Sequence, residues 1–141
     1  MKYLLLIAFL SSFMSLNTQQ LKKHRWENRV LLIISENESS DLVKLQLELL
    51  NNPNELKERK LIIYRIHPKK YGLADATKTN WIKGSKLYNV HNSKKSKFKV
   101  VLIGLDGDIK LEQSKILNSE KLFSTIDRMP IRQRKLKDNR K

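Results

Sequence analysis

Three histidines and two adjacent serines are the side chains of this sequence best suited to metal binding or nucleophilic catalysis. His24, His67 and His91 stand 43 and 24 residues apart, so no two of them have the short spacing of a local metal-ligand pair. We therefore expect three exposed loop histidines. Ser39 and Ser40 precede a predicted helix without a surrounding Gly-x-Ser-x-Gly motif, so we expect them to cap that helix rather than act as nucleophiles.

Two short motifs are similar to ligand-binding loops but lack essential residues. Asp106 and Asp108 match the start of a calcium-binding loop, but the later ligands and the closing glutamate are missing, which predicts turn residues. Gly84-Ser85-Lys86 lacks the upstream glycine of a phosphate-binding loop. Cysteine is absent, which excludes disulfides, thiolate metal sites and thiol redox catalysis. The sequence thus predicts no metal, no cofactor and no catalytic residue.

Charge is the strongest chemical signal of the chain. Lys and Arg number 29 against 14 Asp and Glu, which gives a net charge of +15. An electrostatic field of this size attracts anionic partners such as nucleic acid, acidic glycans or anionic lipid surfaces. The alternative interpretation is that the charged residues only form a well-solvated surface. The end of the chain concentrates the charge, with seven basic residues against Asp138. These predicted anion-binding residues are Arg128, Arg132, Arg134, Lys135, Lys137, Arg140 and Lys141.

This C-terminal segment is expected to contact phosphate or sulfate groups through charge, with a steep dependence on salt. The alternative is a tail that only keeps the protein soluble. Lys94, Lys95 and Lys97 would extend the basic patch if the fold places them beside it.

Residues 1–19 have the anatomy of a signal peptide. Lys2 forms a short positive region, residues 3–10 are apolar, and small serines follow near the expected cleavage point. We therefore expect an exported protein, periplasmic or extracellular, with no stable membrane span after cleavage. One alternative is a membrane anchor, but an anchor needs about 20 apolar residues and this apolar run is shorter. The other alternative is a first helix that is buried in the domain.

Two apolar runs predict strands that are buried on both faces. Residues 29–35 contain five consecutive aliphatic side chains, and residues 60–66 form a second run of this kind. A helix is expected between them over residues 41–50, and a crossover helix implies that the two strands are parallel. The expected buried face of this helix is the stripe Leu42, Leu45 and Leu49, widened by Val43, Leu47 and Leu50.

The segment 69–97 is the least regular part of the sequence. Trp81, Ser85 and Tyr88 fall at positions i, i+4 and i+7, which predicts a helix over residues 79–88. The end of the segment, NVHNSKKSK, is expected to be a basic loop.

The last part of the chain predicts a hairpin followed by a helix. Residues 98–103 and 109–112 are expected to be antiparallel strands, because Asp106-Gly107 between them is a strong signal for a tight turn. The final helix is expected to begin after an N-cap at Asn118 and to end before Pro130.

In order, these elements form a β-α-β-α-β-β-α chain, which is the minimal thioredoxin-like plan. We expect an α/β fold, a three-layer sandwich with a mixed sheet of four strands. One domain over residues 20–130 would follow the signal peptide, and residues 131–141 would form a basic C-terminal tail.

Several motifs of the chain are similar to those of one family. They are Trp26 with Arg29-Val-Leu-Leu, Glu58-Arg-Lys-Leu-Ile-Ile, Phe98-Lys-Val-Val-Leu-Ile-Gly-Leu-Asp-Gly, Ile109-Lys-Leu and Asp127-Arg-Met-Pro-Ile-Arg. Through these motifs the chain, from about Trp26 to Arg134, resembles an uncharacterised, thioredoxin-like family of domains of unknown function. That family occurs as single exported bacterial domains and as the C-terminal domain of sushi-repeat-containing extracellular proteins. The resemblance implies the thioredoxin-like fold and no settled activity.

Two positions that carry thioredoxin chemistry hold other residues in this chain. The place of the Cys-x-x-Cys motif holds residues 35–40, SENESS, and the place of the cis-proline holds Lys95-Ser96-Lys97. Serine cannot form a disulfide, and the two glutamates would oppose a thiolate. The resemblance therefore implies the fold without the redox chemistry.

The predicted function is binding. We expect an exported, non-catalytic domain whose basic face contacts anionic polymers or envelope surfaces. One alternative is a protein-protein interaction module of the cell envelope that uses the sheet edge or residues 69–97. The other is an enzyme whose site is assembled from residues distant in sequence, such as His67, Tyr71 and His91.

Overall fold

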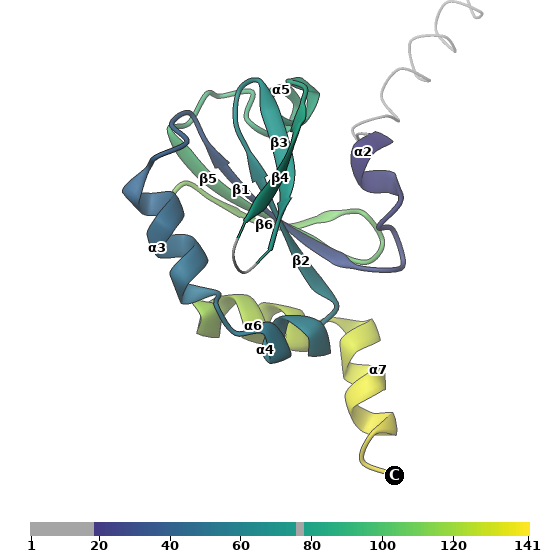
Figure 1. Cartoon of the computed structure of the whole chain (residues 1–141). Helices are drawn as coiled ribbons and strands as arrows, with labels where there is room; N and C mark the ends of the chain where they lie inside the picture. The colour runs from purple at the N-terminus through teal and green to yellow at the C-terminus, as the bar shows by residue number, and fades with distance from the viewer. Residues whose placement is uncertain (1–18, 76–77) are drawn as a thin grey trace, which may run out of the picture.

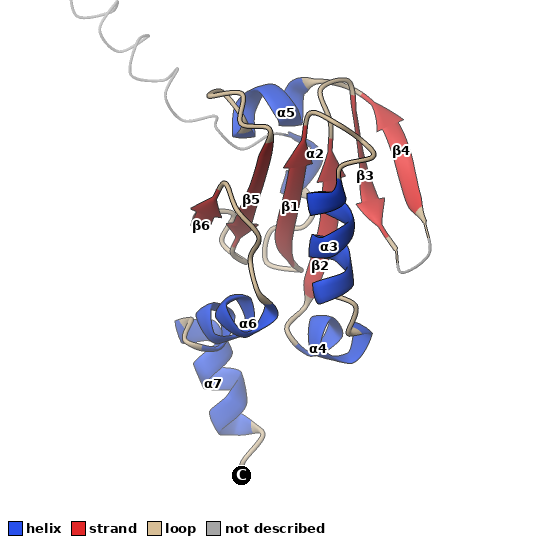
Figure 2. Ribbon diagram, turned by 90° about the vertical axis from the view of Figure 1, so that its left-hand side faces the viewer, coloured by secondary structure: helices blue, strands red, loops and turns tan. Residues whose placement is uncertain are grey.

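The computed structural model describes residues 19–75 and 78–141, so the expected signal peptide lies almost wholly outside the described residues. The described chain is a mixed α/β fold around one six-stranded sheet with the order β4-β3-β2-β1-β5-β6 (Figure 1, Figure 2). The α/β class is confirmed, but the prediction of four strands is wrong. The strands are β1 (Arg29–Ser35), β2 (Leu61–Ile66), β3 (Lys70–Ala74), β4 (Thr79–Lys83), β5 (Phe98–Ile103) and β6 (Ile109–Gln113).

Helices flank this sheet, with α3 in front of it and α5 behind its upper end in Figure 2. No helix within the described residues is long and apolar enough to cross a membrane. The helices are α2 (Gln19–Lys22), α3 (Asp41–Leu49), α4 (Pro53–Glu58), α5 (Lys86–His91), α6 (Ser119–Asp127) and α7 (Pro130–Asp138).

β1 is the centre of the sheet, and all seven of its residues are buried. It pairs in parallel with β2, as predicted, and antiparallel with β5. Its side chains alternate between two cores, because successive residues of a strand point to opposite faces. Leu31 and Ile33 pack with α3 and α6, whereas Val30, Leu32 and Ile34 pack with α5.

The expected helix over residues 79–88 is wrong. β3 pairs antiparallel with β2, β4 pairs antiparallel with β3, and α5 begins only at Lys86. Gly72 of β3 lies where a Cβ atom would collide with the backbone of Asn80, so glycine permits the close approach of the two strands. Trp81, which fits a helical stripe in the sequence, is half-buried in β4 beside His67.

The hairpin and the last predicted helix are confirmed. Gly107 has a φ of 87°, which glycine adopts readily, and Asp106 Oδ1 accepts a hydrogen bond from the Asp108 N–H at 3.0 Å. The Asn118 side chain caps α6 at 2.7 Å. Pro130 does more than end this helix. It is the first residue of α7, where a missing N–H costs nothing, so the expected tail is helical as far as Asp138.

The leucine stripe predicted to be buried in α3 lies outside. Leu42, Leu45 and Leu49 are 44%, 44% and 39% exposed. The prediction is wrong because the face of α3 that is buried has a polar residue at its centre, so its residues do not form an apolar stripe in the sequence. Gln46 is fully buried, and its amide donates to the Leu117 carbonyl and accepts from the Leu117 N–H, both at 2.8 Å. The buried face, at helical spacing, consists of Val43, Gln46, Leu47 and Leu50.

Candidate anion-binding surfaces

Four segments of the chain meet at the end of the sheet where the parallel strands β1 and β2 finish. Ser35, the last residue of β1, pairs with Phe98, the first residue of β5. Lys70 at the start of β3 pairs with Lys83 at the end of β4. In open α/β sheets, ligands bind preferentially at this carboxyl end of the parallel strands.

Backbone hydrogen bonds tie the loops of this end together. The Gly84 N–H donates to the Lys69 carbonyl at 2.8 Å, and the Glu36 N–H donates to the Lys97 carbonyl at 3.2 Å. The loops therefore form one surface, at the top of Figure 1 beside α5. We call this surface the lysine end and define it by Lys69, Lys70, Lys83, Lys86, Lys94, Lys95 and Lys97.

Six of these seven lysines are exposed and form no ion pair within the described chain. Lys70 is the exception, because its Nζ lies 2.6 Å from Glu38 Oε2. This hydrogen bond lowers the pKa of Glu38 below its ordinary value. Glu36 is the other carboxylate of the β1–α3 loop. Positive charge is thus in clear excess at the lysine end, which attracts anions.

Trp81 of β4 and Tyr71 of β3 are half-buried aromatic residues of this region, and the chain's own cations occupy the ring of Trp81. The Cζ atom of Arg65 lies 4.9 Å and the Nζ atom of Lys70 lies 4.4 Å from the ring centroid. The ring of His67 is 5.0 Å away, centroid to centroid, and its Nδ1 donates to the Ser35 carbonyl at 2.8 Å. Trp81 therefore offers little free ring surface on which a ligand could stack.

The seven residues predicted to bind anions near the C-terminus do not share one environment. Arg132 is only 2% exposed, and its guanidinium lies 2.7 Å from Glu58 Oε1 and 3.1 Å from Asp127 Oδ1. The hydrogen bond from Arg132 lowers the pKa of Glu58. Arg132 thus holds α7 against α4 and α6 and is not free for an external anion. The exposed members are Arg128, Arg134, Lys135, Lys137, Arg140 and Lys141.

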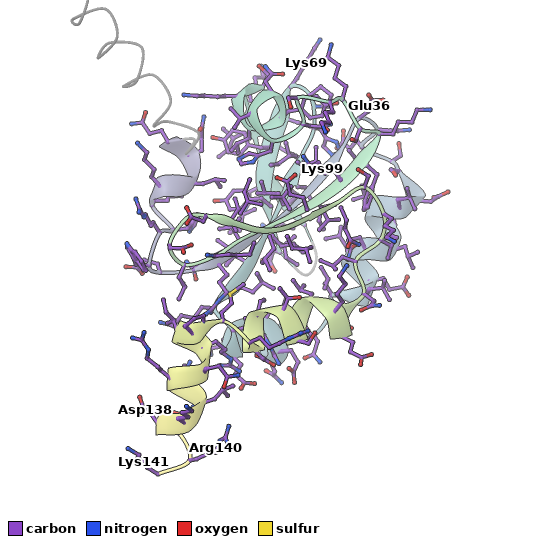
Figure 3. All side chains as sticks on the ribbon, turned by 180° about the vertical axis from the view of Figure 1, so that it is seen from behind. Glu36, Lys69, Lys99, Asp138, Arg140 and Lys141 are labelled. Atoms are coloured by element: carbon purple, nitrogen blue, oxygen red, sulfur yellow. The ribbon has the colours of Figure 1, made fainter. Side chains whose placement is uncertain are left out.

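The lysine end and the exposed cations of α7 lie at opposite ends of the domain. Figure 3 shows Lys69 at one end and Arg140 and Lys141 at the other. The expectation that residues 94–97 extend the C-terminal patch is therefore wrong. The seven residues of β1 span roughly 20 Å at about 3.3 Å per residue, more than the Debye length of about 8 Å in physiological salt. The two regions therefore act on a ligand independently.

The three histidines are more buried than the sequence predicts. His67 and His91 are 4% and 8% exposed, and His24 is half-buried. His24 Nε2 lies 2.8 Å from the Tyr64 hydroxyl, and its Nδ1 lies 3.5 Å from Asn28 Nδ2. Burial lowers the pKa of all three histidines below the ordinary value of 6.5, because desolvation disfavours the imidazolium form.

Mild acid is expected to destabilise the protein through these three histidines. Their pKa values are lower in the folded state than in the unfolded state, so the unfolded chain binds more protons as the pH falls. The free energy of unfolding should therefore be at its full value above about pH 6.5 and fall as the pH drops below it. Urea unfolding at pH 7.5, 6.0 and 5.0 measures this change. Equal urea midpoints at all three pH values would contradict it.

The alternative of an enzyme site around His67, Tyr71 and His91 gains no support from their positions. His91 lines a pocket together with His24, but neither His67 nor Tyr71 lines it. In the part of the chain that the structure describes, no group of three His, Cys, Asp or Glu side chains could hold a metal ion.

The two serines at the start of α3 do not cap it as expected. Ser40 occupies the N-cap position, but its side chain makes no capping hydrogen bond. Ser39 instead bonds Asn37 Oδ1 through its N–H at 3.0 Å and its hydroxyl at 3.2 Å. Asn37 thus organises the loop that leads into the helix, and the Ser35 hydroxyl supports it by donating to the Asn37 carbonyl at 2.7 Å and accepting from the Asn37 N–H at 3.2 Å.

Comparison with known proteins adds a family to this geometry. No curated protein and no solved structure matches the chain. The model of a family described as "Domain of unknown function (DUF4174)" matches residues 20–135, which include every described strand and the first two thirds of α7. The chain therefore belongs to the DUF4174 family of domains of unknown function.

Proposed function

We propose that the protein is an exported, non-catalytic domain that binds an acidic polysaccharide, with the lysine end as its main contact surface. The observation that carries this proposal is the convergence of seven lysines, six of them exposed, from separate loops onto one end of the sheet. These six lysines have no acidic partner in the described chain, so a polymer with closely spaced sulfate or carboxylate groups would neutralise them. The exposed cations of α7 form a second, weaker contact.

A thioredoxin-like fold is part of this proposal. The parallel unit β1-α3-β2, the antiparallel pair β5-β6 and the following α6 match that plan, and the β3-β4 hairpin is an addition at the sheet edge. Thioredoxins carry their thiols at the carboxyl end of the first of these strands. In this chain the same end carries residues 35–40, without cysteine, beside the lysine loops. Export rests on the signal-peptide pattern of residues 1–19.

A polysaccharide suits the lysine end better than a nucleic acid does. Proteins that bind single-stranded nucleic acid stack its bases on aromatic side chains, in addition to contacting phosphates. Trp81, the tryptophan of this region, already has Arg65 and Lys70 over its ring. Tyr71, the other aromatic residue there, is half-buried and packs against the core beside α5. Lysine ammonium groups without a free stacking platform bind a charged polymer without reading bases.

Heparin affinity chromatography tests the proposal. The wild-type protein is expected to bind heparin at low salt and to elute by about 0.3 M salt. Replacing Lys69, Lys86 and Lys94 by glutamine removes one exposed cation from each of three segments of the lysine end and should lower the eluting salt by about 0.1 M.

A matched control removes the same charge elsewhere. Lys23, Lys78 and Lys115 are exposed and lie outside both basic regions, so their replacement by glutamine changes net charge equally. This control should elute close to the wild type. If the two triple variants elute together, the lysine end is not the binding surface. Retention of the wild type on single-stranded DNA at the same salt as on heparin would contradict the choice of a polysaccharide.

A second candidate function is protein-protein interaction, and one observation favours it. Leu42, Leu45 and Leu49 form an exposed apolar stripe along α3. Exposed apolar patches often mark contacts with another protein. Salt separates the two candidates, because apolar binding persists at salt concentrations that release an electrostatically bound polymer.

A further inference from the structure

A pocket of about 210 Å³ lies between the segment that leads into β1 and the β5–β6 turn. Segments far apart in sequence build it: the α2 region, the start of β1, the end of α5, and the hairpin that contains Gly104 and Gly107. At about 30 Å³ per water molecule, its volume equals roughly seven waters. It is below the 300–1,000 Å³ range typical of drug-sized ligands, so it suits a small molecule.

The lining of this pocket combines an apolar wall with cations. Leu21, Val30, Ile103 and Ile109 provide the apolar wall, and most of the exposed lining surface is apolar. Lys22 and Arg25 line the same pocket and are themselves exposed. Asp108 is the one carboxylate among the lining residues. Cationic groups thus exceed anionic ones, which favours a ligand with an apolar body and a negative group.

The Arg25 side chain lies against the hairpin turn. Its Cδ and Nε atoms lie 3.8 Å from the position that a Cβ atom of Gly107 would occupy. The next residue, Trp26, has a φ of 67°, an unfavourable conformation for a bulky side chain. A hydrogen bond of 2.6 Å from the Trp26 N–H to the Leu105 carbonyl ties the lead-in segment to the turn. The lead-in segment and the hairpin turn are therefore joined directly beside the pocket that they line.

His91, at the end of α5, forms part of the pocket wall and is only 8% exposed. Its Nε2 has no hydrogen-bond partner in the described structure and is buried, so it is closed to a ligand in the pocket. His24 engages Tyr64 and Asn28 through its two nitrogens. The two histidines therefore close the pocket, and the charged groups at its lining are Lys22, Arg25 and Asp108.

We propose that this pocket binds a small apolar carboxylate, with its hydrocarbon part on the aliphatic wall and its charge beside Lys22 and Arg25. Burial lowers the pKa of His91, so the ring is neutral and the two exposed cations supply the positive charge. This site does not include the lysine end, so its test does not depend on polysaccharide binding.

The four glycines of the chain allow a direct test by NMR. Gly104 and Gly107 line the pocket, whereas Gly72 and Gly84 lie in or beside the β3–β4 hairpin. The full chain, labelled with ¹⁵N-glycine, is titrated with phenylacetate at pH 7.5. We expect saturable shifts of the Gly104 and Gly107 amide signals and none of the Gly72 and Gly84 signals. Absence of saturable shifts, or equal shifts of all four signals, would overturn the proposal.

Matched probes test the chemical class of the ligand. Phenylacetamide and 2-phenylethylamine have almost the same shape as phenylacetate but are neutral and cationic. Phenylacetate is expected to bind about tenfold more tightly than either of them. An affinity for the amide or the amine equal to that for the acid would overturn the assignment of a carboxylate.

Two substitutions test the named side chains. Arg25→Gln and Lys22→Gln are each expected to weaken phenylacetate binding about fivefold. Lys23→Gln, next to the pocket in sequence but not in its lining, should leave the affinity unchanged. Lys22 and Arg25 are both exposed, so both variants are expected to fold. Arg25→Gln binding as tightly as the wild type would contradict the role of the cation.

Discussion

Gln46→Ala is expected to lower the free energy of unfolding by about 4 kcal/mol, because it removes two buried hydrogen bonds and side-chain volume at once. Gln46 is fully buried in α3, and its amide bonds both the N–H and the carbonyl of Leu117, just before α6. Alanine would leave both backbone groups without partners and also leave a cavity. Urea unfolding of the two proteins, with equal slopes, measures the difference.

Gln46→Leu separates the hydrogen bonds from the cavity, because leucine fills most of the same space. It should still cost about 2–3 kcal/mol, since two buried backbone groups lose their partners. Gln113→Leu is the matched control, because Gln113 also bonds loop carbonyls but is only half-buried, and its loss should cost less than about 1 kcal/mol. Equal costs for the two leucine variants would contradict the account of α3.

Arg132→Ala is expected to lower the free energy of unfolding by about 2–3 kcal/mol. Its guanidinium is buried, whereas its partners Glu58 and Asp127 are partly solvated, which reduces the cost below that of a wholly buried pair. Asp127 also keeps its hydrogen bonds to Arg59. Arg128→Ala, at an exposed position nearby, should change stability by less than about 0.5 kcal/mol. The measurement is again urea unfolding, and equal stability of the two variants would contradict a structural role for Arg132.

The role of Arg132 also decides how the C-terminus is tested. A truncation of residues 131–141 removes Arg132 with the exposed cations, so it changes the fold and the surface together. Replacement of Arg134, Lys135 and Lys137 by glutamine removes charge from α7 and keeps the buried ion pairs. This variant isolates the contribution of α7 to binding.

The elements that the sequence predicts correctly are those with strong local signals. The consecutive aliphatic residues of β1 and β2 are largely buried, as expected for strands without alternating polar residues. The Asp106-Gly107 turn and the Asn118 cap depend on residues a few positions apart, so the sequence contains the whole signal. Local chemistry of this kind needs no knowledge of the rest of the fold.

The elements that the sequence does not reveal depend on distant contacts. β3 and β4 are short and rich in polar residues, and their pairing depends on the close approach at Gly72. The buried face of α3 is hidden because Gln46 is satisfied by Leu117, 71 residues away. The sequence predicts that Arg132 belongs to an exposed charged tail, yet its side chain is buried beside Glu58 and Asp127. A polar residue is predicted to be exposed unless the partner that would satisfy it in the core is known.

The candidate site is predictable only in part for the same reason. Seven basic residues close together in sequence make the C-terminal segment visible. The lysine end is built from pairs and singles at the ends of β2, β4 and α5, and only the pairing of strand ends brings them together. The sequence does show lysines beside several strand ends. They predict a common basic surface only when the strand order is known, because the strand order decides which strand ends lie together.

The salt dependence of heparin binding tests the central claim most directly. The dissociation constant of the full chain for a heparin fragment is measured between 50 and 200 mM salt, for the wild type and both triple lysine variants. Removing Lys69, Lys86 and Lys94 is predicted to reduce the slope of log K against log salt by about 2, because each lost contact contributes roughly 0.7–0.9. Removing Lys23, Lys78 and Lys115 should leave the slope unchanged. Equal slopes for the two variants would contradict a binding surface at the lysine end.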